Sequence, residues 1–248
     1  MASPSIAAAD TTSGSQASNS TSWTATHCGN IGAGDLLMLW VSADGSNSWA
    51  SATGWTQHSF VSEGTVTLTL LLKDAAGTES GSLAVTIANS EQGVWRMNRI
   101  PASEWHGDVT DGIGIDVGAP TSGSGTGPNP GSNAQPGTWG SEDVLYVAAA
   151  ASDHGNTTYT GFPTNYTQQD HTTAGGHTQE SGGAGGAAMG IAYRKGTAGT
   201  EDPSAFTTDA AEGWVAVVVA VRAAAVVLAR VPRGVRTALQ AVARASSF

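Results

Sequence analysis

The sequence has one cysteine, few charged residues and no apolar run typical of a membrane span. Cys28 has no second cysteine to pair with, so an intrachain disulfide is excluded and the fold depends on packing. The apolar run at 214–229 contains Arg222 and is shorter than the roughly 20 residues that a bilayer requires. The first residues show no basic segment and no continuous apolar segment. We therefore expect no export signal, synthesis in the cytoplasm and no membrane partner.

The charges are unevenly distributed along the chain. Ten Lys and Arg residues stand against 20 Asp and Glu residues, which gives a formal net charge of -10 at pH 7. Five of the ten bases lie at or after position 222 with no acid among them, so the preceding body has five bases against 20 acids. An acidic body repels a phosphate backbone, which argues against nucleic-acid binding by the main fold.

Glycine is abundant, with 33 residues, and apolar residues make up 40% of the chain. This composition is typical of short strands that are joined by turns around a packed core. Residues 65–72 alternate between Thr and larger apolar residues, which indicates a strand with one buried face. Residues 213–221 are apolar at nearly every position, which is typical of a strand covered on both faces. The sequence therefore predicts an all-β protein.

Five segments of the first half recur in the same order in the second half, which indicates a tandem duplication. The alternative is that glycine-rich β-proteins resemble one another by composition alone. The pairs are 35–43 with 143–151, 54–57 with 165–168, 70–73 with 191–194, 76–79 with 198–201, and 93–95 with 213–215. One of them is identical, because Ala-Gly-Thr-Glu occupies both 76–79 and 198–201.

We expect a duplicated antiparallel β-sandwich of jelly-roll-like build. Its predicted parts are a flexible extended arm at 1–20, β-sandwich units at 21–118 and 119–222, and a basic docking segment at 223–248. The two units can form two small sandwiches or one sandwich with a pseudo-two-fold axis. Two closely packed sandwich copies are the interpretation that we favour.

The basic C-terminal segment is predicted to be partly helical. Val235, Leu239 and Val242 fall at i, i+4 and i+7, which gives one apolar stripe. A helix this short is marginal in water without a surface to pack on. It either docks on a partner or packs on the protein's own acidic surface, and the pattern does not choose between these. The candidate partner-binding residues are Arg222, Arg230, Arg233, Arg236, Leu239, Val242 and Arg244.

No catalytic or metal-binding constellation is apparent, so we expect no catalytic residue, cofactor or metal. The carboxylates show no glycosidase-like pair, and no Gly-x-Ser-x-Gly elbow is present. The loop histidines lack the spacing of metal ligands. The turns at 44–47 and 153–156 resemble half of a calcium loop without its terminal glutamate. The residues weighed here are Glu63, Glu79, Glu91, Glu104, His154, His171 and His177.

Three tryptophans fall near expected loops and are candidates for stacking on a ligand: Trp49, Trp105 and Trp139. Exposed aromatic rings can stack on sugars or anchor a protein contact. Packing beneath a loop is the more common role for such a residue.

The repeated units resemble β-sandwich structural proteins of tailed double-stranded DNA bacteriophages. The resemblance rests on the apolar strands, the Gly54-Trp55-Thr56 and Asn165-Tyr166-Thr167 turns, the Ala-Gly-Thr-Glu turns and the passage from Pro128 to Asp143. It covers about residues 20–222 and implies a role in the virion, as a capsid decoration or a tail or fibre component. It also implies virion proteins as partners and homo-oligomers in the particle.

We therefore expect a non-enzymatic virion structural protein, with a capsid decoration or surface protein as the first choice. Its terminal segments would attach it to neighbouring subunits. The alternative is a tail fibre, adhesin or carbohydrate-binding module that uses the loop aromatics. A glycan-degrading enzyme is a third and weaker interpretation.

Overall fold

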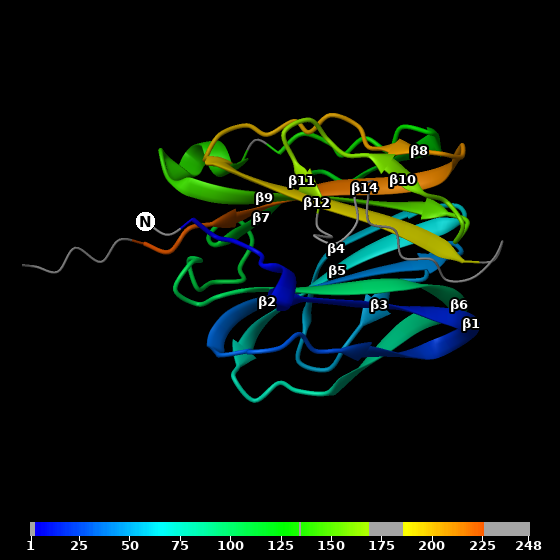
Figure 1. Ribbon diagram of the computed structural model, residues 1–248, viewed down its shortest axis with the longest axis horizontal. Coiled ribbons are helices and arrows are strands. Elements are labelled where there is room, and N and C mark those ends of the chain that lie inside the picture. Colours follow the sequence, from blue (N-terminus) through cyan, green and yellow to red (C-terminus); the bar gives the residue numbers. More distant parts are fainter. Residues whose placement is uncertain (1–2, 134, 169–185, 226–248) are drawn as a thin grey trace, which may run out of the picture.

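The chain folds almost entirely into antiparallel β-strands, as the sequence predicts. The computed structural model describes residues 3–133, 135–168 and 186–225. The described strands form two six-stranded sheets and one two-stranded sheet (Figure 1). Within this part of the chain, no helix combines the length and the apolar character needed to cross a membrane.

The first sheet comes from the first half of the chain and has the order β1-β6-β2-β5-β4, with β3 paired to β6. A short 3-10 helix, η1 (Ala8–Asp10), precedes it. Its strands are β1 (Thr11–Thr26), β2 (Ala33–Asp44), β3 (Ala50–Ser51), β4 (Thr56–Glu63), β5 (Val66–Ala76) and β6 (Ser82–Ile100).

The second sheet has the order β11-β12-β9-β14-β7, with β8 paired to β14, and a separate small sheet joins β10 to β13. A second 3-10 helix, η2 (Gln135–Trp139), lies between β8 and β9. The strands are β7 (Ile115–Val117), β8 (Thr121–Gly125), β9 (Asp143–Asp153), β10 (Tyr159–Gly161), β11 (Thr167–Gln168), β12 (Ala187–Thr197), β13 (Thr207–Thr208) and β14 (Glu212–Arg222).

The two large sheets face each other and share one core. Trp40 of β2 and Leu70 of β5 lie in the same buried cluster as Val147 of β9, Ile191 of β12 and Val217 of β14. Figure 1 shows the two sheets as stacked layers. The protein is therefore one two-sheet sandwich.

Of the two arrangements that the sequence leaves open, the structure has the single sandwich, so the favoured interpretation of two sandwich units at 21–118 and 119–222 is corrected. Each half of the chain forms one sheet, and neither half makes a sandwich alone. The predicted boundary also moves, because β7 lies before residue 118 but pairs with β14 of the second sheet. An apolar strand indicates that its faces are buried, but it does not indicate which sheet buries them.

The strand order is the same in the two sheets. β1, β6, β2, β5 and β4 of the first sheet correspond to β8, β14, β9, β12 and β11 of the second. Trp40 lies opposite Leu70, and Ala149 lies opposite Ile191, the residue matched to Leu70. Trp40 therefore corresponds to Ala149, so the predicted pairing of 35–43 with 143–151 is one residue out of register. A tandem duplication would produce this shared order, and the duplication itself stays a prediction.

Each large sheet is also covered on its outer face. The pairing of β1 with β6 shifts register between residues 16 and 22 and then continues in a distal part of both strands. Trp23, in this distal part, lies in one buried cluster with Leu37 and Leu39 of β2. On the second sheet, Tyr159 of β10 and Phe206 lie edge to face and belong to a cluster that includes outer alanines of β9. This double coverage explains why β2 and β9 are apolar at nearly every position.

The N-terminal segment belongs to the fold, which corrects the prediction of a flexible arm at 1–20. Ile6 is 2% exposed and lies in the core that the two sheets share. Residues 11–16 pair with β6 along its C-terminal half. The predicted helix in the basic C-terminal segment lies outside the described residues.

Candidate functional site

The first and last described residues meet at one end of the sandwich. Ser3 donates a hydrogen bond to the carboxylate of Asp143 at 3.0 Å, and Ser5 donates to Glu104 at 2.5 Å. The amides of residues 223 and 224 donate to the backbone carbonyls of the same Asp143 and Glu104, at 3.0 and 3.1 Å. We call this region, around Asp143 and Glu104, the terminal end. Figure 1 shows both described chain ends on this side of the body.

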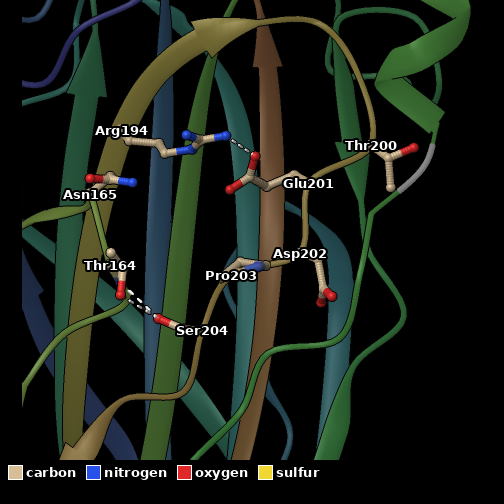
Figure 2. Close-up of a pocket in the computed structure, with 8 residues that line it drawn as sticks. All are labelled: Thr164, Asn165, Arg194, Thr200, Glu201, Asp202, Pro203 and Ser204. Atoms are coloured by element: carbon tan, nitrogen blue, oxygen red, sulfur yellow. Dashed lines mark hydrogen bonds and ion pairs between the residues drawn. The ribbon is translucent and has the colours of Figure 1, made fainter.

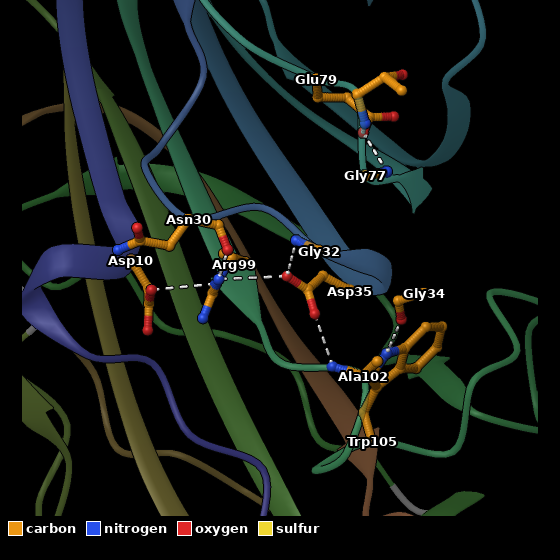
Figure 3. A network of polar contacts seen from close by, with 11 residues as sticks. Asp10, Asn30, Gly32, Gly34, Asp35, Gly77, Glu79, Arg99, Ala102 and Trp105 are labelled. Atoms are coloured by element: carbon orange, nitrogen blue, oxygen red, sulfur yellow. Dashed lines mark hydrogen bonds and ion pairs between the residues drawn. The ribbon is translucent and has the colours of Figure 1, made fainter.

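A buried ion-pair cluster stabilises the terminal end (Figure 3). The Arg99 guanidinium lies between two carboxylates, 3.0 Å from Asp10 and 3.3 Å from Asp35. Asp35 also accepts backbone N–H groups from Gly32 at 2.7 Å and Ala102 at 2.8 Å. Because Asp10 belongs to η1, the cluster connects the N-terminal segment to β2 and β6.

Arg222, a predicted partner-binding residue, is engaged within the protein. Its Nε and one terminal nitrogen contact the two carboxylate oxygens of Glu142 at 2.5 and 2.9 Å. Its guanidinium also lies 5.7 Å from the centre of the Trp139 ring. The hydrogen bonds from Arg222 lower the pKa of Glu142. The prediction is therefore corrected for Arg222. The other predicted residues lie outside the described residues: Arg230, Arg233, Arg236, Leu239, Val242 and Arg244.

Of the three aromatics predicted to stack on a ligand, only Trp49 is exposed. Its exposed fraction is 44%, against 1% for Trp105 and 7% for Trp139. The indole N–H of Trp105 donates to the carbonyl of Gly34 at 2.9 Å, and that of Trp139 donates to Gly112 at 3.2 Å. Trp105 and Trp139 are therefore packing residues, which corrects their assignment as ligand-stacking residues.

The two turns that resemble half of a calcium loop lie close together. The carboxyl group of Asp44, at the end of β2, lies within hydrogen-bonding reach of Asp153, at the end of β9, and Glu91 is also nearby. Within the described ranges, no group of three or more His, Cys, Asp or Glu side chains is arranged to hold a metal ion. His154 follows Asp153 in this turn, whereas His171 and His177 lie outside the described ranges.

The Asp44–Asp153 pair predicts a pH-dependent stability. Burial and the neighbouring charge of Asp153 raise the pKa of Asp44 to about 6, from an ordinary value of 3.8. The folded protein therefore holds this proton more tightly than the unfolded chain. Its contribution to stability is fully present below about pH 4 and is lost as the pH rises through about 6.

We expect Asp44→Asn to raise the free energy of unfolding at pH 8 by about 1 kcal/mol, a value reduced because the side chain is only half-buried. The variant should also flatten the stability profile between about pH 4 and pH 7. Urea denaturation across this range measures both effects. Asp202→Asn, at an exposed carboxylate, is the control. An unchanged pH profile in Asp44→Asn would contradict the assignment.

A polar pocket of about 350 Å³ lies on the second sheet (Figure 2). Arg194 of β12 and Glu201 form an ion pair in it. Thr164, Asn165 and Ser204 lie on one side, and Figure 2 shows the hydrogen-bonded Thr164 and Ser204 facing each other. Thr200, Asp202 and Pro203 complete the lining.

Two tyrosine side chains contact the ion pair. The hydroxyl of Tyr166 donates to Glu201 at 2.8 Å. The Arg194 guanidinium lies 5.5 Å from the ring centre of Tyr146 and 5.8 Å from that of Tyr166. Hydrogen bonding to Glu201 raises the pKa of Arg194. The pair is therefore fixed in place.

In the equivalent turn of the first half, the glutamate carboxylate accepts hydrogen bonds from the backbone of its own turn. Glu79, the counterpart of Glu201, binds Lys73 at 2.9 Å and accepts the backbone N–H groups of residues 76, 77 and 78. Burial raises the pKa of Glu79, but hydrogen bonds from the Ala76 amide and Lys73 outweigh burial and lower this pKa to about 2. In the second half, the carboxylate of Glu201 instead contacts Arg194 and Tyr166.

Sequence reasoning missed Arg194, Glu201 and Tyr166 as a group. Each lies in a segment that was matched between the halves, so the repeat itself was the available signal. Comparing the two copies residue by residue would have paired Arg194 and Glu201 with Lys73 and Glu79.

No protein-family model, no curated protein and no solved structure matches this chain.

Proposed function

We propose that this protein is a non-enzymatic structural component of a bacteriophage particle, a capsid decoration or surface protein that its terminal segments attach to neighbouring subunits. The observation that carries the proposal is the meeting of both described chain ends at the terminal end. The basic residues at 230, 233, 236 and 244 follow directly from this end in the sequence. An attachment made there leaves the rest of the sandwich facing solvent.

The body has the features expected of a rigid module. Its two sheets share one core, and each outer face carries a further covering layer. The formal charges of the body are mainly acidic, whereas those of the C-terminal segment are basic. An acidic neighbouring surface would attract the segment without attracting the body. Virion proteins are the proposed partners, with further copies of this chain among them.

A carbohydrate-binding module or adhesin that uses loop aromatics is the alternative. It is supported by the exposure of Trp49. Trp105 and Trp139 are buried, so a stacking surface built from all three rings has no support. A single exposed ring gives this alternative less support than the meeting of the chain ends gives to attachment.

Truncation after residue 225 is expected to abolish incorporation into particles while leaving the body folded. The cut spares the amides of residues 223 and 224, which bind Asp143 and Glu104. The measurement is the copy number in purified particles, with thermal melting of the free protein alongside. A second variant that replaces the arginines at 230, 233, 236 and 244 with glutamine tests charge without shortening the chain. Incorporation of the truncated protein at the full-length level would overturn the proposal.

A further inference from the structure

The layer that covers the outer side of the first sheet has a regular, exposed face. The distal parts of β1 and β6 form this layer together with β3, on the side of the first sheet that faces away from the second sheet (Figure 1). Along these strands, side chains alternate between the buried cluster and solvent. We call the solvent side the outer face, and its exposed residues are Trp49, Ser22, Thr24 and Thr26 of β1, and Ser82, Ala84, Thr86 and Ala88 of β6.

The inward residues of the same strands hold the outer face in place. Trp23 of β1 and Val85 of β6 are each 1% exposed and lie in one buried cluster. Thr86 lies opposite Ser22 of β1 on one side and opposite Ser51 of β3 on the other. Thr86 therefore marks the middle of a three-stranded surface that is supported from below.

The outer face carries no formal charge. Residues 11–26, 50–51 and 82–90 include no Asp, Glu, Lys or Arg, in a chain whose formal net charge is -10. The cover of the second sheet differs, because Asp202 and Asp209 are exposed there. Two copies of an acidic protein repel each other, and the repulsion is weakest where neither of the facing surfaces carries charge. The outer face is therefore a surface on which two copies can meet.

The chemistry of the outer face is complementary to itself. A Ser or Thr hydroxyl both donates and accepts hydrogen bonds, so two such faces satisfy each other. Their side chains are small, which suits the spacing of about 10 Å at which two sheets pack face to face. Trp49 lies beside Ala88, whose N–H donates to the carbonyl of Trp49 at 3.0 Å. The Trp49 side chain is 44% exposed, and an exposed tryptophan on an uncharged surface is a common anchor of protein contacts.

The size of the outer face indicates a weak contact. Three strands about 4.8 Å apart, each about seven residues long at about 3.3 Å per residue, cover roughly 300 Å² in projection. Because accessible area exceeds projected area, two such faces bury on the order of 1,000 Å² in total, near the lower limit of specific interfaces. We therefore expect weak association between free copies, which is strengthened where many copies are held in one particle.

We propose that the outer face binds the outer face of a second copy of this chain in a two-fold contact. The inference deepens the proposed function, on which it rests for the role of this contact in a particle, by naming the surface through which further copies are partners. The outer face is separate from the basic C-terminal segment. Self-association of the free protein and incorporation into particles are therefore measured separately, and either can fail without the other.

Sedimentation equilibrium of the full-length protein, at concentrations from about 10 μM to about 1 mM, tests the proposal. We expect a dimer with a Kd on the order of 100 μM in salt of about 0.5 M. Lowering the salt to about 0.05 M should weaken the association at least about threefold, because the two bodies carry like charge. An association made by the basic segment on an acidic surface would respond to salt in the opposite direction, and truncation after residue 225 would abolish it.

Thr86→Glu places a like charge in the middle of both outer faces, so we expect it to weaken self-association at least about tenfold. Thr207→Glu is the matched control, because it adds the same charge at an exposed residue of β13 on the second sheet, and it should leave the Kd within about twofold. Trp49→Ala should weaken self-association about fivefold. Thermal melting of the three variants checks that each is folded.

Three results would overturn the proposal. The first is a protein that stays monomeric at about 1 mM in high salt, because the outer face is then covered by a different partner or by none. The second is an association that weakens as salt rises or disappears on truncation after residue 225. The third is a Thr86→Glu variant that associates as strongly as Thr207→Glu.

Discussion

Replacing Trp105 with alanine is expected to lower the free energy of unfolding by about 3–5 kcal/mol, the usual loss for a buried aromatic side chain. Trp105 is 1% exposed and lies in the core shared by the two sheets. Its indole N–H also donates to the carbonyl of Gly34 at 2.9 Å. The variant therefore loses core packing and a hydrogen bond together. Urea denaturation followed by far-ultraviolet circular dichroism measures the loss.

Trp49→Ala is the matched control for this prediction. The Trp49 side chain is 44% exposed, so its removal should change the free energy of unfolding by less than about 0.5 kcal/mol. The two variants remove the same side chain from two residues that the sequence places near loops. Equal losses in both would contradict the placement of Trp105 in the shared core.

The strands were predictable because their patterns are local. The apolar runs around 35–43 and 143–151 fall within β2 and β9, and residues 66–72 fall within β5. The expectation that β5 buries only one face was wrong, because Thr67 and Thr69 are buried as well.

The pairing of the halves was not predictable in the same way. Trp40 and Leu39 are both fully buried, one between the sheets and one beneath the distal part of β1 and β6. Their apolar character is the same, so the sequence does not distinguish the two environments.

The aromatic and basic candidates show a second limit. Trp49, Trp105 and Trp139 all lie near turns, but only tertiary packing decides which of them faces solvent. The sequence groups Arg222 with the basic C-terminal segment, because no acid follows it in the chain. Its partner Glu142 is 80 residues away in sequence and adjacent to it in space. Long-range ion pairs of this kind leave no local pattern.

Several basic residues of the body form ion pairs within the protein. Lys73 binds Glu79, Arg194 binds Glu201 and Arg222 binds Glu142, each pair within the described part of the chain. These pairs neutralise few of the 20 acids, so the body keeps a strong excess of negative charge. The arginines after residue 225 are thus the main basic groups that remain for an attachment, which is consistent with the proposed role of that segment.

Arg99→Leu is expected to lower the free energy of unfolding by about 3 kcal/mol, because it leaves two carboxylates buried without their cation. The side chains of Asp10 and Asp35 are 12% and 7% exposed, and Arg99 is their shared basic partner. Arg99→Leu with Asp10→Asn should recover about 1 kcal/mol, since one uncompensated charge is removed. Urea denaturation of the single and double variants at pH 7 measures both values.

Lys73→Leu is the control for Arg99→Leu. It shows whether the loss of stability is specific to the buried Asp10–Arg99–Asp35 cluster or follows from removing any ion pair. Its partner Glu79 keeps three backbone N–H groups when the lysine is removed, so its charge stays solvated by the turn. Glu79 is itself only 4% exposed, so we expect a loss of about 1–2 kcal/mol, smaller than that of Arg99→Leu because one carboxylate loses its cation instead of two. If Arg99→Leu costs no more than Lys73→Leu, the Asp10–Arg99–Asp35 cluster does not hold the N-terminal segment in place. A larger loss for Arg99→Leu, with partial recovery through Asp10→Asn, means that the terminal end depends on this buried charge cluster.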